Sequence, residues 1–340
     1  MCKWMALALC FAVLGGVEAQ WASFGRMNRV EGDVHVLKLG SVDWEDAISN
    51  LVIEAGDIIK TGAHDFAEIE LEHGTLVRMD EVTELRVRYL EKDQENSDWI
   101  VGMDLLYGVV RVETPQIAGW NIDFDLEMPN GSVNIGEDVH AKIIVRRSGA
   151  SKIIAYNGDV FVAGEWDELW LCSGEMVWIS ASGDVERPSR ISTVTEGRFD
   201  RWCAEYRPII CESRRYVDTH IYIGVHCLDT YGDWVWLVDC GWTWRPRVRS
   251  GWCPYRHGRW TWSVGFGWFW VSCEPWGWVP FHYGRWAYSS VYGWVWIPGC
   301  TWGPGWVAWS HGPGWVSWVP LGADDRPVRR NDAYTAVKSD

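Results

Sequence analysis

A tryptophan-rich repeat of 26 residues is the feature that most constrains the fold of this chain. Three segments align without a gap: GDWVWLVDCGWTW from Gly232, GRWTWSVGFGWFW from Gly258 and GRWAYSSVYGWVW from Gly284. Nineteen of the 28 tryptophans lie between Trp234 and Trp318. A fixed period of this size indicates stacked copies of one supersecondary unit rather than an irregular loop.

Each copy is predicted to form a β-hairpin. In the second copy, Trp260 and Trp262 precede a spacer of four residues, and Trp268 and Trp270 follow it. Residues two apart on a strand share a face, so each pair forms an aromatic row, and the short spacer fits a turn. We therefore expect an array of about three to four hairpins, closed by an atypical unit at Trp306–Trp318.

Charge divides the chain near residue 200. Residues 1–200 contain 17 Lys and Arg against 35 Asp and Glu, a net charge of −18, whereas residues 201–340 contain 14 against 11, a net charge of +3. This asymmetry and the length of 340 residues predict two domains. Binding to phosphates needs a concentrated basic face, so we do not expect nucleic acid to be a partner.

The N-terminus has the features of a secretory signal peptide over residues 1–19. Lys3 precedes an apolar run over residues 4–14, and residues 17–19 form a small-x-small cleavage site. The apolar run is too short for an ordinary span, so we expect export to the periplasm or the extracellular space. We expect no transmembrane segment in the mature chain, because Gly, Pro and charged residues interrupt its Trp-rich part every few residues. Retention of this segment as an uncleaved anchor is the alternative.

Eight cysteines follow the predicted signal peptide. An even number in an exported chain favours disulfides, and the absence of paired CxxC motifs argues against a zinc site. Eight cysteines allow about 105 pairings, so the connectivity stays open. The disulfide candidates are Cys172, Cys203, Cys211, Cys227, Cys240, Cys253, Cys273 and Cys300.

Residues 28–186 show the alternation of apolar and polar residues that is typical of β-strands. Apolar residues alternate with glutamates over 67–72, and with Glu84, Arg86 and Arg88 over 84–89. We expect half-buried strands with charged outer faces, on which Glu and Arg rows pair across the sheet. Turn signals separate the strands, so the pattern predicts an all-β domain, either a sandwich or a solenoid-like stack.

Several motifs of this domain resemble the FecR domain. They are RVEGDV at 29–34, Trp44, EAGDIIKT at 54–61, GTL at 74–76 and FDLEMPNGSVNI at 124–135. The resemblance covers residues 28–186 and implies an exported all-β module, found in transducers that control a sigma factor and in uncharacterised envelope proteins. The chain lacks the cytoplasmic helical segment of the transducers ahead of its hydrophobic run, so we do not expect direct control of a sigma factor.

One short helix is expected near residues 195–207, after a linker at 187–194. Its apolar residues are spaced at i, i+3, i+4 and i+7 and so share one helical face. A proline at position 208 would end it. The apolar residues are Phe199, Trp202, Cys203 and Tyr206.

The segment 196–322 resembles a domain of unknown function that commonly follows a FecR domain. The strings HYGRW at 282–286 and PGWVAW at 304–309 carry this resemblance, which implies no activity. We therefore assign residues 195–322 to a second domain of Trp-rich hairpins, and residues 323–340, which are polar, to a disordered tail.

No enzyme class is indicated by the sequence. The motifs of serine hydrolases, zinc proteases, P-loop proteins and dinucleotide-binding proteins are all missing, so we expect a non-enzymatic protein without cofactor or metal. A carbohydrate-active enzyme is one alternative, since Glu165, Asp167 and Glu168 cluster around Trp166. A glycosidase needs two carboxylates that face each other across a sugar, and a charged hairpin tip is the commoner explanation of such a cluster.

The tryptophans permit two interpretations. Most are expected to form the core, while those between the hairpins form a platform for an envelope polysaccharide or a protein partner, with arginines bracing the rings. The leading hypothesis is an exported envelope binding or scaffold protein, and a FecR-like signalling role is a further alternative. The candidate platform residues are Trp276, Trp278, Trp302, Trp306, Arg259 and Arg285.

Overall fold

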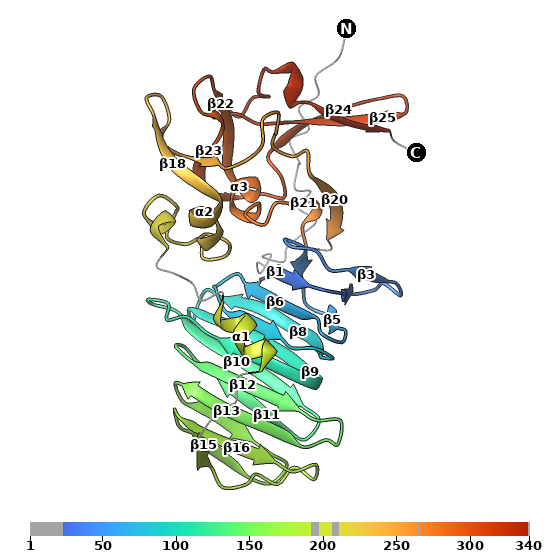
Figure 1. Cartoon of the computed structure of the whole chain (residues 1–340), viewed down its shortest axis with the longest axis vertical. Coiled ribbons are helices and arrows are strands. Elements are labelled where there is room, and N and C mark those ends of the chain that lie inside the picture. Colours follow the sequence, from blue (N-terminus) through green and yellow to red (C-terminus); the bar gives the residue numbers. More distant parts are fainter. Residues whose placement is uncertain (1–22, 192–196, 206–210, 264, 339–340) are drawn as a thin grey trace. The chain divides into compact units, whose positions relative to one another are not determined.

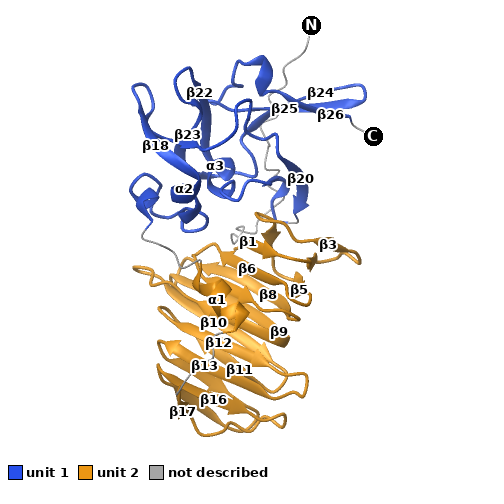
Figure 2. Cartoon of the chain, viewed as in Figure 1, with its two compact units in different colours: residues 1–18, 208–340 blue, residues 19–207 orange. Residues whose placement is uncertain are grey.

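The computed structural model describes residues 23–191, 197–205, 211–263 and 265–338. The predicted signal peptide therefore lies outside the described residues. The chain divides into two compact units, shown in orange and blue in Figure 2. We call residues 19–207 the N-terminal unit and residues 208–340 the C-terminal unit.

The N-terminal unit is built almost entirely of β-strands that stack one after another along it (Figure 1). Within the described residues the strands are β1 (Gly25–Glu31), β2 (Val34–Leu37), β3 (Trp44–Asp46), β4 (Val52–Ile53), β5 (Ile58–Thr61), β6 (Phe66–Leu71), β7 (Leu76–Met79), β8 (Glu84–Asp93), β9 (Asp98–Glu113), β10 (Asn121–Met128), β11 (Gly131–Ile135), β12 (His140–Val145), β13 (Ser151–Asn157), β14 (Val160–Ala163), β15 (Glu168–Leu171), β16 (Glu175–Ile179) and β17 (Ser189–Arg190).

These strands form two sheets that share β9. The first sheet has the order β4-β1-β6-β7-β9-β12-β13-β16-β17, and the second has the order β3-β2-β5-β8-β9-β10-β11-β14-β15. The chain adds strands to the two sheets in turn, and the residues between the sheets are apolar and buried. The open choice between sandwich and solenoid thus resolves into a sandwich that grows stepwise along the chain.

Gly108 is the point at which β9 passes from the second sheet to the first. Its φ of 107° is a conformation that residues with a side chain rarely adopt. A Cβ at this position would also lie 2.3 Å from Oγ1 of Thr83. Both the backbone conformation and the lack of space therefore require glycine at the crossing.

Charged side chains do pair across strands, but not as the two predicted rows: Arg88 pairs with Asp104 and Asp125. Arg86 is exposed as predicted, whereas the prediction of an outer face is wrong for Glu68 and Glu70. Arg26 pairs with Glu70 and Arg78 pairs with Glu68 across neighbouring strands, and all four side chains are buried. Part of this charged face is covered by the helix α1 (Arg198–Ala204). Strand alternation identifies which residues share a face, and does not reveal that another element will cover that face.

Helix α1 lies within the range predicted for it, but it packs on the N-terminal unit rather than belonging with the hairpin repeats. The rings of Phe199 and Trp202 lie 5.7 and 5.3 Å from the ring of Phe66 on β6. The ammonium group of Lys142 donates to the carboxylate of Asp200 at 2.8 Å. Tyr206 and the proline at 208 lie outside the described residues.

The predicted linker at 187–194 is partly a strand in the structure. Its residues Ser189 and Arg190 form β17, which pairs with β16. This pairing satisfies backbone groups on the edge of the first sheet, and the rest of the linker from residue 192 lies outside the described residues.

His73 is a fully buried histidine in the turn between β6 and β7. Its ring stacks on the ring of Trp99 with 5.0 Å between centroids. Burial, and after it the ammonium group of Lys92, lower the pKa of His73 from 6.5 to about 3. Between about pH 3 and pH 6.5 the folded chain therefore keeps this imidazole neutral, whereas the unfolded chain protonates it.

We expect His73 to make the N-terminal unit less stable in mild acid. Between pH 6.5 and pH 3 the unfolded state binds a proton at His73 that the folded state does not bind. The free energy of unfolding is therefore unaffected by His73 above pH 6.5 and decreases as the pH falls below it. At pH 5 the loss is about 2 kcal/mol. Urea unfolding of the wild type and of His73→Gln at pH 7.5 and pH 5 measures it. An identical loss in the two proteins would contradict the assignment to His73.

The C-terminal unit contains short helices and paired strands. Within the described residues these are η1 (Glu212–Arg215), α2 (His226–Tyr231), β18 (Gly232–Leu237), β19 (Gly241–Pro246), β20 (Gly258–Ser263), β21 (Gly267–Ser272), α3 (Trp278–His282), β22 (Tyr283–Ser289), β23 (Gly293–Trp302), β24 (Val307–Gly312), β25 (Trp315–Pro320), η2 (Asn331–Ala333) and β26 (Thr335–Lys338). They form sheets with the orders β18-β19-β23-β22, β20-β21 and β24-β25-β26.

The predicted hairpin repeat is confirmed. The three copies are the hairpins β18–β19, β20–β21 and β22–β23, and the irregular closing unit is the hairpin β24–β25. The second strand of each repeat begins with a glycine, Gly241, Gly267 or Gly293, whose φ lies between 71° and 76°. A positive φ at this position closes a three-residue turn, which explains the invariant spacing of glycine within the repeat.

The prediction of a disordered tail over 323–340 is wrong for its described part. Strand β26 pairs with the outer edge of β25, with Thr335 opposite Trp318 and Lys338 opposite Trp315. A polar composition does not prevent such pairing, because the backbone groups of an open strand edge need partners whatever side chains the new strand carries.

The predicted disulfides are absent from the described residues, in which all eight cysteines are free. The eight cysteines lie on separate helices, strands and turns of both units. An even number of cysteines therefore did not indicate that they lie close enough to pair. Burial raises the pKa of the Cys203 thiol to about 11 and that of Cys253 to about 12, which keeps both thiols protonated.

No described helix has both the length and the apolar character needed to cross a membrane.

Candidate functional site

Each repeat hairpin carries a ladder of two aromatic pairs on one face. The inner pairs are Trp234/Trp244, Trp260/Trp270 and Trp286/Trp296, and the outer pairs, next to the turn, are Trp236/Trp242, Trp262/Trp268 and Tyr288/Trp294. In all three outer pairs the rings meet edge to face, with centroids 5.6–5.7 Å apart and interplanar angles of 78–83°. This arrangement is favourable for aromatic rings and repeats with the sequence.

The two pairs of a ladder differ in burial. Trp244, Trp270, Trp286 and Trp296 of the inner pairs are fully buried, whereas the four outer tryptophans of the first two hairpins are 45–60% exposed. In the third hairpin Tyr288 is exposed and Trp294 is buried. The first two hairpins therefore each expose two indoles next to the turn. The inner pair of the same hairpin, which includes the buried Trp244 or Trp270, lies beside them on the same face.

Residues 225–325 match a family of unknown function, DUF6600. The match contains all three repeat hairpins and lies almost wholly within the segment 196–322, for which a domain of unknown function was predicted. The exposed indole pairs are thus features of the DUF6600 segment of this chain. The resemblance of residues 28–186 to the FecR domain stays a prediction.

Two solved structures are similar to part of the chain. They are crystal structures, at 1.65 and 2.50 Å resolution, of a "putative anti-sigma factor" from Parabacteroides distasonis ATCC 8503. The TM-score is 0.32 and the sequence identity 14% and 13%, over 39% of this chain and 59% of those chains. The chain thus spans less than two thirds of these structures, and the likeness is too distant to assign a function. No curated protein matches the chain.

The predicted aromatic platform between the hairpins is not exposed. Trp276 and Trp278 are buried, with the ring of Trp276 lying 4.9 Å from that of Trp244. Trp302 and Trp306 are half-buried, and Trp302 stacks on the ring of His282 at 5.8 Å. Residues 276–282, between the second and third hairpins, are buried, whereas the indoles next to the turns of the first two hairpins are exposed.

The arginines of the predicted platform have different environments. The guanidinium of Arg285 lies 3.5 Å from the centroid of Trp306 and also forms an ion pair with Asp325. This contact confirms that Arg285 braces an indole. Arg259 is exposed on β20.

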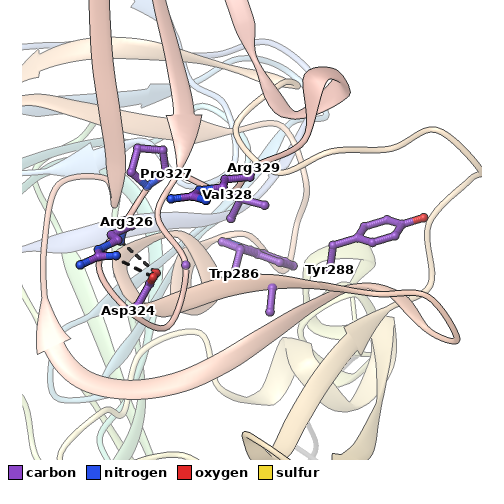
Figure 3. A pocket seen from close by; sticks show the side chains of 9 residues that line it. Trp286, Tyr288, Asp324, Arg326, Pro327, Val328 and Arg329 are labelled. Carbon is purple, nitrogen blue, oxygen red and sulfur yellow. Dashed lines mark hydrogen bonds and ion pairs between the residues drawn. The ribbon is translucent and has the colours of Figure 1, made fainter. Parts of the chain in front are cut away.

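A pocket in the C-terminal unit lies between β22 and the segment 322–329, and Figure 3 shows the side chains that line it. Asp324 is the carboxylate among its lining residues, and its oxygen lies 4.0 Å from a nitrogen of Arg326. A glycosidase mechanism needs two carboxylates on opposite sides of the sugar, and this pocket offers one. The cluster of Glu165, Asp167 and Glu168 lies on the exposed edge of the N-terminal unit instead.

The described ranges contain no group of three or more His, Cys, Asp or Glu side chains arranged to hold a metal ion. The buried His282 has its Nδ1 atom 3.0 Å from the carbonyl oxygen of Gly303. This histidine takes part in the packing of the interior.

The exposed indoles at the turns were not among the predicted site residues. The sequence holds part of a signal for them, since in the first two copies the exposed indoles are the aromatic residues closest to the four-residue spacer. In the third copy, Trp294 at the same position is buried. Recognising this signal requires knowing that the base of each of the first two hairpins, and not its turn, is anchored in the core.

Proposed function

We propose that this chain is an exported, non-enzymatic binding protein of the bacterial cell envelope that holds a polysaccharide through the turns of its Trp-rich hairpins. The observation that supports this most strongly is the pair of exposed indoles at each of two hairpin turns. We call these four residues, Trp236, Trp242, Trp262 and Trp268, the turn tryptophans.

The turn tryptophans suit a ligand because they are exposed and yet held in place. Exposed indoles cost free energy in water, since each could bury a large apolar area elsewhere. Each pair is fixed by its edge-to-face contact and by the inner pair next to it, such as the half-buried Trp260 and the buried Trp270, whose centroids lie 5.4 Å apart. A ligand that stacks on such a surface loses little free energy to the ordering of side chains.

A polysaccharide fits this arrangement better than a folded protein surface does. The C–H bonds on one face of a pyranose ring stack on an indole, and one ring matches one exposed side chain. The surface is repeated rather than continuous, and two weak sites on one unit bind a repeating polymer more tightly than either site alone. Export is supported by the signal-like segment at 1–19, and a non-enzymatic role by the missing catalytic motifs.

We expect Trp262→Ala with Trp268→Ala to weaken polysaccharide binding by about tenfold or more, because both rings of one site are removed. Affinity electrophoresis of the full chain in gels that contain soluble glucan, mannan or peptidoglycan fragments measures the retardation. The control is Trp166→Ala with Trp170→Ala, which removes two exposed indoles from the N-terminal unit and is expected to leave the retardation unchanged. Equal retardation of the wild type and the Trp262/Trp268 variant would contradict the proposal.

A further inference from the structure

The two sheets of the N-terminal unit end in different ways. Beyond β16, the first sheet is closed by the chain itself: β17 pairs with Glu175 and Met176. The amide of Glu186 donates to the carbonyl of Trp178 at 2.8 Å, and that of Ile191 donates to Gly174 at 2.9 Å. The edge of the first sheet is therefore covered along most of its length.

The second sheet ends in β15, whose outer edge has no such cover. Strand β15 pairs with β14 on one side, from Glu168 opposite Ala163 to Leu171 opposite Val160. The residue pairings of the described strands leave its other side without a partner: β16 pairs with β13 and β17, not with β15. Figure 1 shows β15 beside β16 at the end of the unit farthest from β1. An open edge of this kind presents unpaired N–H and C=O groups to any extended chain that approaches it.

The open edge carries the two most exposed tryptophans among the described residues. Trp166, in the turn before β15, is 76% exposed, and Trp170, on the strand, is 65% exposed. The ring of Trp170 meets that of Phe161 on β14 edge to face at 5.4 Å. Exposed apolar rings on an open edge promote association, so they are unexpected on a surface that only has to stay in solution.

The charges around these rings indicate the kind of partner. Glu165, Asp167 and Glu168 are all exposed, and no described cation forms an ion pair with any of them. Two copies of β15 placed edge to edge would bring these carboxylates against each other, which opposes self-association. A segment rich in Lys or Arg would instead be attracted to all three of these carboxylates.

We propose that β15 is a docking edge for an extended basic segment of a partner protein, which adds to the second sheet as a further strand. The backbone of the segment pairs with the open edge of β15. Glu168, Trp170 and Phe161 share the outer face of the sheet, so the cations of the segment lie on that face, against Glu168 and the ring of Trp170 and near Glu165 and Asp167. Its alternate apolar side chains continue the inner face beside Leu169 and Leu171. This surface lies on the N-terminal unit and does not depend on the turn tryptophans or on their proposed ligand.

The test uses the full chain and a fluorescent nine-residue peptide in which lysine and valine alternate. We expect saturable binding by fluorescence anisotropy, weakened about tenfold or more by Trp170→Ala and by Glu168→Lys, and weakened by added salt. The matched control is Trp44→Ala, which removes an exposed indole from β3, the strand at the other end of the same sheet, and is expected to have no effect. Thermal unfolding confirms that each variant is folded.

Two further peptides separate strand addition from simple attraction of charge. A peptide with proline in place of alternate valines keeps the charge and loses backbone donors, so we expect it to bind at least tenfold more weakly. A peptide with glutamate in place of lysine is expected not to bind. Equal binding of the proline peptide, or unchanged binding to Trp170→Ala, would overturn the proposal. Self-association of the chain that Trp170→Ala abolishes would assign the edge to a second copy and overturn it as well.

Discussion

Replacing Trp244 with alanine is expected to lower the free energy of unfolding of the C-terminal unit by about 3–5 kcal/mol. The indole is fully buried, its Nε1 atom donates to the carbonyl of Leu228 at 3.0 Å, and its ring lies 4.9 Å from that of Trp276. A Cβ on Gly232 would lie 2.3 Å from the same ring, so the backbone of the neighbouring strand is packed directly against it. The substitution leaves a cavity that this close packing cannot fill.

The matched control is Trp242→Ala, two residues away on the same strand and on the same face. Trp242 is 45% exposed and belongs to the outer pair, so we expect a loss of about 1 kcal/mol. Differential scanning calorimetry of the full chain separates the transition of the C-terminal unit from that of the N-terminal unit. Equal effects of the two substitutions would show that the inner and outer pairs do not differ as their burial indicates.

The second large effect is expected at Arg78 in the N-terminal unit. Its buried guanidinium pairs with Glu68 and, at 2.6 Å, with Glu113. Arg78→Ala leaves the buried carboxylate of Glu68 without its cation, and breaking a buried pair in this way costs about 3–5 kcal/mol. Urea unfolding followed by circular dichroism measures the loss.

The control for Arg78 is an exposed ion pair in the same unit. Arg198 and Glu31 are 2.9 Å apart and both are exposed, so Arg198→Ala is expected to cost less than about 1 kcal/mol. Adding Glu68→Gln to Arg78→Ala should recover part of the stability, because it removes the uncompensated charge. If the double variant is no more stable than Arg78→Ala, the loss comes from packing and not from the buried carboxylate.

The hairpins could be predicted because their signals are local. The repeat places aromatic residues two apart on either side of a glycine, and the observed register sets Trp260 opposite Trp270 and Trp262 opposite Trp268. The helix α1 was predicted for the same reason, since Phe199, Trp202 and Cys203 share one helical face. Strand alternation and helical spacing are properties of a few consecutive residues, and the structure keeps them.

The candidate site could not be predicted in the same way. Trp276 and Trp262 have the same side chain and both lie in the Trp-rich segment, yet one is buried and the other is 60% exposed. The difference depends on which end of each hairpin enters the core, and that depends on contacts between segments far apart in the chain. The same holds for Glu68 and Glu70, which alternation places on one face and which arginines from other strands enclose.

The sequence by itself determined the β character of the chain, the position and turn of each Trp-rich hairpin and the faces that its side chains share. These follow from the geometry of a strand, in which residues two apart point the same way, and from the freedom of glycine to adopt a positive φ. Tertiary structure alone decided which faces are buried, where the helix α1 packs, that the eight described cysteines stay free, and which strand edge is left open in the described part of the chain. Burial and strand pairing depend on contacts between segments that are distant in the sequence, and a local sequence pattern does not identify the segment that will make the contact.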